Sequence, residues 1–219
     1  MNIRQFTCLA LLVLLGGVAH ADEEVNVSDL PATRPVDNVP KLAWGQMIKY
    51  GEKVIFSPCR DRSFVLFEDA SGDGHVGKAL DLLGLSTGKK IYVEVLGIHE
   101  GDVLKASQIN FAQTDGRCQM PGGTAELWRA SGNEPGWALS FGSEFVQVKR
   151  RGQPEAVVPA GPLTLTPGLA TFSASKDNQK VTLHFEQKLC RDAAAQAFFG
   201  WTATVTVDGQ VLKGCAWQR

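Results

Sequence analysis

The acidic, glycine-rich stretch from Glu68 to Ala79 contains the residues whose types and spacing come nearest to a known chemistry. Gly72–Lys78 fits the G-x-x-x-x-G-K spacing of a phosphate-binding loop and lies between a predicted strand and a predicted helix, as such a loop requires. Ala79, however, stands where a Ser or Thr should hold magnesium, and the carboxylates of Asp69 and Asp73 would repel phosphate. The sequence therefore does not favour nucleotide binding.

The same loop also resembles part of a calcium-binding loop. Asp69, Ser71, Asp73 and Gly74 match the first, third, fifth and sixth positions of the EF-hand pattern. The twelfth position, which should be a bidentate Glu, is Leu80. We interpret the loop as a solvated turn, with weak calcium binding at Asp69–Asp73 as the alternative.

Other residues capable of catalysis do not form a recognised set. His75, His99 and His184 are far apart in the sequence and lack the H-x-x-x-H spacing of a zinc site. Ser173–Lys176 has S-x-x-K spacing, but the companion S-D-N and K-T-G motifs are missing. We therefore predict no catalytic residues, no metal site and no cofactor, and expect that the protein is not an enzyme. A hydrolase or metal-dependent enzyme whose site assembles only in three dimensions is the alternative.

The segment Asn133–Trp137, NEPGW, is the most informative polar stretch. The simplest interpretation is a structural turn, in which proline and glycine fix the bend and the tryptophan enters the core. The functional alternative is a recognition surface, because polar loop residues on a rigid scaffold commonly bind partners. The candidate binding residues are Asn133, Glu134, Trp137, Arg191 and Asp192.

Residues 1–21 have the pattern of a cleaved secretory signal peptide. Arg4 precedes an apolar run from Phe6 to Val18, and Ala19–Ala21 supplies an A-x-A cleavage site. The run is too short to span a bilayer, and no later stretch approaches a membrane span. Cys8 lacks the context needed for lipidation. We expect a soluble periplasmic protein that is not lipid-anchored.

The four cysteines that follow the signal peptide are predicted to form two disulfides. An even number of cysteines in an oxidising compartment indicates a disulfide framework, and four allow three connectivities. Spacing favours Cys59–Cys118 and Cys190–Cys215, each within one candidate module. Each bond would stabilise the fold by roughly 3–4 kcal/mol in the chain-entropy model.

Two β-rich modules follow a leader. Residues 22–43 are acidic and proline-punctuated and predict a flexible segment. Residues 44–120 predict an OB-like small barrel of several strands with one short helix. The expected strands are Lys53–Ser57, Ser63–Phe67, Lys90–Ile98 and Val103–Phe111, and the expected helix is Lys78–Leu85.

The second module is predicted at residues 124–219, after a boundary at Met120–Gly123. Lys180–Leu189 alternates apolar and polar residues as a half-buried strand does. Trp201–Val207 and Gln210–Cys215 flank the preferred turn dipeptide Asp-Gly and predict a hairpin. The fold class is therefore mainly β: an OB-like barrel followed by a small antiparallel β-barrel or sandwich, each with one disulfide.

Residues 53–119 resemble the C-terminal domain of NlpE-type envelope-stress lipoproteins. The resemblance rests on IFSPCRDRSFVLFE, GKKIYVEVLGIHEG and the closing Cys118. It implies an OB-like barrel. The chain lacks the acylated cysteine and the upstream paired-cysteine domain of that family, so the copper and stress-signalling roles do not carry over.

Residues 125–219 resemble an uncharacterised family of bacterial envelope proteins. The resemblance rests on the G-N-E-P-x-W segment and on a C-x-D … T-V-x-x-D-G … G-C ending. These domains are distantly similar to META proteins and lysozyme inhibitors, which implies a small β module and no established activity.

We predict a non-enzymatic periplasmic protein that binds an envelope protein or a small ligand and is a monomer. Inhibition of a hydrolase, immunity or a part in envelope stress is the specific form of this hypothesis. The alternative is a ligand- or metal-carrying protein, or the hydrolase described above. Nucleic acid is not an expected partner, because the formal net charge of −1 includes Arg4 and becomes −2 without it.

Overall fold

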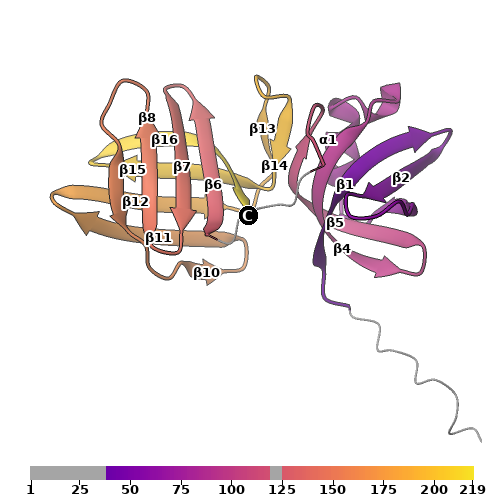
Figure 1. Ribbon diagram of the computed structural model, residues 1–219, viewed down its shortest axis with the longest axis horizontal. Helices are drawn as coiled ribbons and strands as arrows, with labels where there is room; N and C mark the ends of the chain where they lie inside the picture. The colour runs from indigo at the N-terminus through magenta and orange to yellow at the C-terminus, as the bar shows by residue number, and fades with distance from the viewer. Residues whose placement is uncertain (1–37, 119–124) are drawn as a thin grey trace, which may run out of the picture. The chain divides into compact units, whose positions relative to one another are not determined.

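The computed structural model describes residues 38–118 and 125–219. The predicted signal peptide, most of the predicted leader and the predicted boundary at Met120–Gly123 lie outside the described residues. The protein is mainly β, as predicted, with 61% of the described residues in strands and 6% in helices. The strands form a seven-stranded and a nine-stranded sheet (Figure 1). No helix within the described ranges is long and apolar enough to cross a membrane.

The first five strands close a small barrel. They are β1 (Lys41–Tyr50), β2 (Lys53–Pro58), β3 (Val65–Asp69), β4 (Ile91–Glu100) and β5 (Val103–Gln113). Their order around the barrel is β1-β2-β3-β5-β4, and β4 pairs back with β1. β3 and β5 are parallel, and the helix lies between β3 and β4 in the chain. This is the OB-like barrel that the sequence predicts.

The helix α1 (His75–Leu82) lies three residues earlier than the predicted Lys78–Leu85. It begins early because the Asp69 carboxylate accepts a hydrogen bond from the Gly77 amide at 2.7 Å, which satisfies an otherwise unpaired N–H of the first turn. It ends early because Gly84, with φ 103°, turns the chain into the 3₁₀ helix η2 (Leu85–Thr87). Val76, Ala79 and Leu80 of α1 pack into the barrel core.

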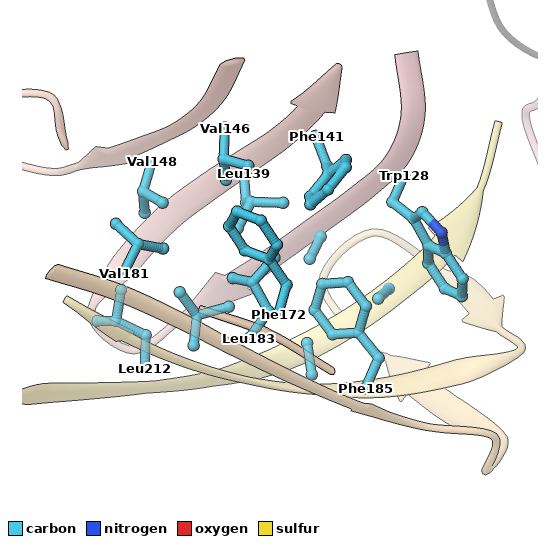
Figure 2. Packing of buried hydrophobic residues seen from close by; sticks show 14 of the residues in the cluster. Trp128, Leu139, Phe141, Val146, Val148, Phe172, Val181, Leu183, Phe185 and Leu212 are labelled. Atoms are coloured by element: carbon cyan, nitrogen blue, oxygen red, sulfur yellow. The ribbon is translucent and has the colours of Figure 1, made fainter. Parts of the chain in front are cut away.

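The second sheet is antiparallel and curls into a half-barrel. Its strand order is β10-β11-β12-β15-β16-β6-β7-β8-β9. The bounds are β6 (Glu126–Asn133), β7 (Gly136–Gly142), β8 (Phe145–Arg150), β9 (Ala156–Pro159), β10 (Thr164–Thr166), β11 (Leu169–Lys176), β12 (Gln179–Glu186), β15 (Trp201–Val207) and β16 (Gln210–Gln218). Inward-facing side chains from these strands, among them Phe141, Leu183 and Phe185, fill one core (Figure 2).

A short hairpin from the second half of the chain joins the first sheet. β13 (Cys190–Asp192) pairs with β14 (Ala197–Phe199), and β14 pairs with β5 at Phe111–Gln113. β3 pairs with the first part of β5, so β14 takes the part that β3 leaves open. Phe198 of this hairpin belongs to the core of the barrel.

The two predicted disulfides are confirmed. Cys59 is bonded to Cys118 and Cys190 to Cys215, with Cα–Cα distances of 5.3 and 5.5 Å. The first bond lies within the barrel module. The second ties β13 to β16 and therefore fixes the hairpin to the nine-stranded sheet.

Candidate functional site

The β13–β14 hairpin is held on three sides. The Cys190–Cys215 disulfide anchors its first strand, and the ladder to β5 pairs its second. Phe199 packs against Phe111 and Trp217, with ring centroids 5.1 and 5.0 Å away. A short hairpin is marginal in water on its own, so these anchors explain how it keeps one conformation.

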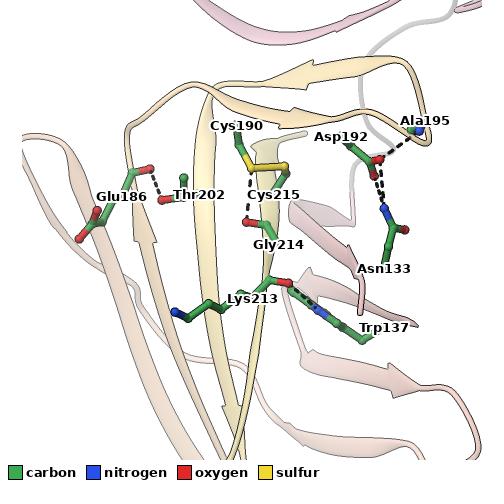
Figure 3. Close-up of a disulfide and its surroundings, with 10 residues drawn as sticks. All are labelled: Asn133, Trp137, Glu186, Cys190, Asp192, Ala195, Thr202, Lys213, Gly214 and Cys215. Atoms are coloured by element: carbon green, nitrogen blue, oxygen red, sulfur yellow. Dashed lines mark hydrogen bonds between the residues drawn. A yellow bond between two sulfur atoms is a disulfide. The ribbon is translucent and has the colours of Figure 1, made fainter. Parts of the chain in front are cut away.

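Asp192 connects this hairpin to the turn between β6 and β7. Both of its carboxylate oxygens accept a hydrogen bond from the Asn133 side-chain amide, at 3.0 Å each (Figure 3). One oxygen also accepts a bond from the Ala195 backbone amide at 3.0 Å, which closes the hairpin turn. Two loops that are distant in the sequence are thereby fixed against each other by one carboxylate.

The Gly-Asn-Glu-Pro-Gly-Trp segment has a structural explanation at both ends. Trp137 is buried, and its indole nitrogen donates to the carbonyl of Lys213 at 3.1 Å (Figure 3). A Cβ on Gly132 would lie 2.3 Å from that nitrogen, and a Cβ on Gly214 would lie 1.9 Å from the Ser131 carbonyl oxygen. The two glycines therefore let β6, β7 and β16 approach closely enough for the tryptophan to bond.

A crevice of about 460 Å³ opens beside the hairpin. It lies between the end of α1, the end of β5 and the hairpin turn, and its lining residues are Leu82, Leu83, Gly84, Thr87, Lys89, Thr114, Arg191, Ala193 and Gln196. Lys89 and Arg191 bring two positive charges to this lining, which contains no carboxylate. The Thr114 hydroxyl donates to the Gln196 side-chain oxygen at 3.1 Å, so the Gln196 amide nitrogen is left to donate elsewhere. The crevice is suited to an anionic group.

The structure brings together most of the candidate binding residues. Asn133 and Asp192 bond directly, Trp137 supports the same turn from the core, and Arg191 lies on the hairpin at the crevice. Glu134 is exposed in the turn, at a cis bond to Pro135. We give the name hairpin surface to the crevice residues Lys89, Arg191 and Gln196 together with Asn133, Glu134 and Asp192, which lie outside the crevice lining.

Lys89, Thr114 and Gln196 are not among the candidates drawn from the sequence. They come from the barrel, the end of β5 and the hairpin turn, and no motif or spacing connects them. The position of Arg191 beside a cysteine was a weak signal for this site in the sequence, since a disulfide fixes its neighbours in place.

A second polar cluster is buried where the C-terminal strand β16 meets β5. Glu94 is 2% exposed and accepts hydrogen bonds from the Tyr92 hydroxyl at 3.0 Å and the Asn110 amide at 2.8 Å. The Asn110 side chain also exchanges two hydrogen bonds with the Gln218 backbone, at 2.9 and 3.0 Å. Burial raises the pKa of Glu94 above its usual range, although these donors and the charge of Arg219 act against the shift.

The acidic loop uses its carboxylates internally. Asp69 accepts bonds from the backbone and hydroxyl of Ser71 and from the Gly77 amide. Asp73 lies 2.6 Å from the His75 ring nitrogen, and its pKa is lowered, chiefly by that hydrogen bond. The Asp69 carboxylate thus occupies the helix N-terminus at which a phosphate would bind, which supports the interpretation of the loop as a turn.

The histidines lie on separate elements. His75 begins α1, His99 is near the end of β4, and His184 faces outward on β12 beside Glu186. Within the described ranges, no group of three or more His, Cys, Asp or Glu side chains is placed to hold a metal ion. Comparisons of the chain with models of protein families, with curated proteins and with solved structures gave no match.

Proposed function

We propose that the chain is a non-enzymatic periplasmic protein that binds an acidic segment of another envelope protein at the hairpin surface. The observation that carries the proposal is the fixed pairing of Asn133 with Asp192 beside a crevice lined by Lys89 and Arg191. A rigid, charged and concave surface loses little entropy when a partner binds.

The chemistry of the site favours recognition over catalysis. The carboxylate of Asp192 accepts three hydrogen bonds from its own protein, so it serves as a brace between loops. In the crevice, the charged and amide groups left to a ligand are donors: the guanidinium of Arg191, the ammonium of Lys89 and the amide of Gln196. Arg191 can bind a carboxylate through two parallel hydrogen bonds.

The compartment and the specific form of the function rest on sequence. Disulfides persist in oxidising compartments, which together with the predicted signal peptide supports the periplasm. The similarity of residues 125–219 to lysozyme-inhibitor-like modules favours inhibition of a hydrolase, or immunity to one, as the purpose of binding.

Binding to the immobilised protein tests the proposal. Periplasmic extract from the source cells is passed over the wild type, over Lys89→Glu/Arg191→Glu and over the matched control Lys53→Glu/Arg62→Glu, whose exposed side chains lie outside the crevice. We expect at least one retained protein to bind the double variant about tenfold more weakly and the control unchanged, because charge reversal replaces attraction with repulsion. Equal retention by all three proteins, or no retention by any, would refute the proposal.

A further inference from the structure

The nine-stranded sheet has an open seam. Because the sheet curls, β9 at one edge packs against β11 and β12 near the other edge. The described strands form no hydrogen-bonded ladder across this seam. A groove of about 720 Å³ runs along it, with Pro159–Pro162 on one wall and Phe172–Ser175 on the other.

The register shows which backbone groups face the seam from β11. Asp177 and Asn178, with φ 50° and 64°, make a two-residue turn, so Lys176 and Gln179 form a hydrogen-bonded pair. Hydrogen-bonded pairs alternate along an antiparallel ladder. The backbone amide and carbonyl of Ala174 therefore form hydrogen bonds with β12, whereas the backbone amides and carbonyls of Ser173 and Ser175 point away from β12.

Those four groups have no strand beside them. β10 pairs with β11 from Leu169 to Thr171 and no further, because β10 is three residues long. The chain before β10 leaves the ladder at Pro162 and Leu163 and forms the far wall of the groove. In the described chain, Ser173 and Ser175 thus present an unpaired stretch of strand edge.

The opposite edge is protected. The Val157 amide of β9 donates to the Gln179 side-chain oxygen at 3.3 Å, and Pro159 has no amide hydrogen to offer. Proline on an edge strand is a common device against unwanted pairing. One side of the seam is therefore closed to a new strand, and the other is open.

We infer that an extended segment of a partner protein binds in this groove by adding a strand to β11. Its backbone would pair with Ser173 and Ser175, and about four or five residues would fill the length of the open edge. Side chains on one face of the bound segment would contact Phe172 and Pro159. Those on its other face would contact the outward-pointing side chains of Thr182 and His184. The segment should therefore carry small apolar residues at every second position. This site is separate from the hairpin surface and does not depend on it.

The test uses the full chain and a phage-displayed library of random dodecapeptides, from which binding peptides are selected and synthesised. Amide hydrogen exchange is then measured with and without each peptide. We expect exchange at Ser173 and Ser175 to slow by about tenfold or more in the complex, because a new hydrogen bond covers each amide. Ala174, already bonded to β12, is the internal control and should not change.

Two variants separate backbone from side-chain recognition. Ser175→Pro removes an edge amide and should weaken binding by about tenfold, whereas Ser175→Ala keeps the amide and should bind as the wild type does. Selected peptides that protect other amides, or binding that Ser175→Pro leaves unchanged, would overturn the inference. Protection of Ser173 and Ser175 on self-association without peptide would assign the edge to a second copy of the chain and would also overturn it. If Ser175→Pro does not fold, the exchange measurement on the wild type tests strand addition by itself.

Discussion

Glu94 is a buried residue through which pH acts on the stability of this fold. It is enclosed by Tyr92, Asn110 and the C-terminal strand, and burial raises its pKa. A group whose pKa is raised on folding stabilises the folded state below its unfolded pKa, and that contribution is lost as the pH rises through the folded value. Glu126 behaves in the opposite way, because the hydrogen bond from Arg129 lowers its pKa.

We expect Glu94→Gln to be more stable than the wild type at pH 8 and to lose that advantage as the pH falls toward 4. The glutamine can accept from Asn110 and donate to the Tyr92 hydroxyl, as a protonated glutamate would, but carries no charge to bury. Urea unfolding at a series of pH values measures the difference.

Glu126→Gln is the matched control. Glu126→Gln should be less stable than the wild type at pH 8, and this difference should vanish as the pH falls through the lowered pKa of Glu126. Plotted against pH, the stability differences of the two variants from the wild type should therefore have opposite signs. A pH-independent difference for Glu94→Gln would contradict this account of the buried carboxylate.

Gly214→Ala should destabilise the protein by about 2–4 kcal/mol. The added methyl would lie 1.9 Å from the Ser131 carbonyl oxygen and would force β16 and β6 apart. Gly72→Ala is the control, because a Cβ there meets nothing within 4 Å. Chemical denaturation with both variants measures the effect, and equal stability would show that the strands can separate freely.

At the scale of elements, the hairpin of β13 and β14 depends on its disulfide. We expect Cys190→Ala/Cys215→Ala to lose about 3 kcal/mol of stability and to speed amide exchange in the hairpin, since one anchor is removed. Cys59→Ala/Cys118→Ala should lose about 4 kcal/mol, because its loop is longer, and leave exchange in the hairpin unchanged. Hydrogen exchange resolved by residue distinguishes the two, and identical exchange patterns would count against the anchoring role.

Sequence patterns predicted the elements in which apolar and polar residues alternate regularly or which end at a turn dipeptide. β4, β12 and the β15–β16 hairpin alternate or end at turn dipeptides, and the structure confirms them. β13 and β14 were missed, because three-residue strands around an alanine-rich turn show no period. The helix was displaced because its start depends on Asp69, a capping residue well before the apolar run.

At the scale of the whole molecule, Phe198 links the two halves of the chain. It comes from the second half but packs in the core of the first barrel. We expect Phe198→Ala to cost about 3–5 kcal/mol and to lower the urea midpoint of both sheets together, because β14 would lose its hold on β5. Phe64→Ala, at a residue 66% exposed, should change little. Tryptophan fluorescence and barrel amide signals should give one transition; a shift confined to the barrel would contradict the coupling.

The same long-range packing explains what the sequence could not predict about the site. Disulfide pairing placed Arg191 and Asp192 beside a fixed strand, which made them reasonable candidates. Lys89 lies in the same crevice as Arg191 because β14 pairs with β5, and no local sequence pattern predicts that pairing.

The late position of β14 has a consequence for how the chain is made. β5 ends at Gln113, but the strand that completes its edge begins only at Ala197. A ribosome therefore finishes most of the second half before β14 can pair with β5 and Phe198 can enter the barrel core. A nonsense mutation before residue 197 does not simply delete the end of the protein: it also removes the strand beside the second part of β5 and takes Phe198 out of the barrel core. Gene fragments that encode either half alone should be poor starting material for fusion or recombination.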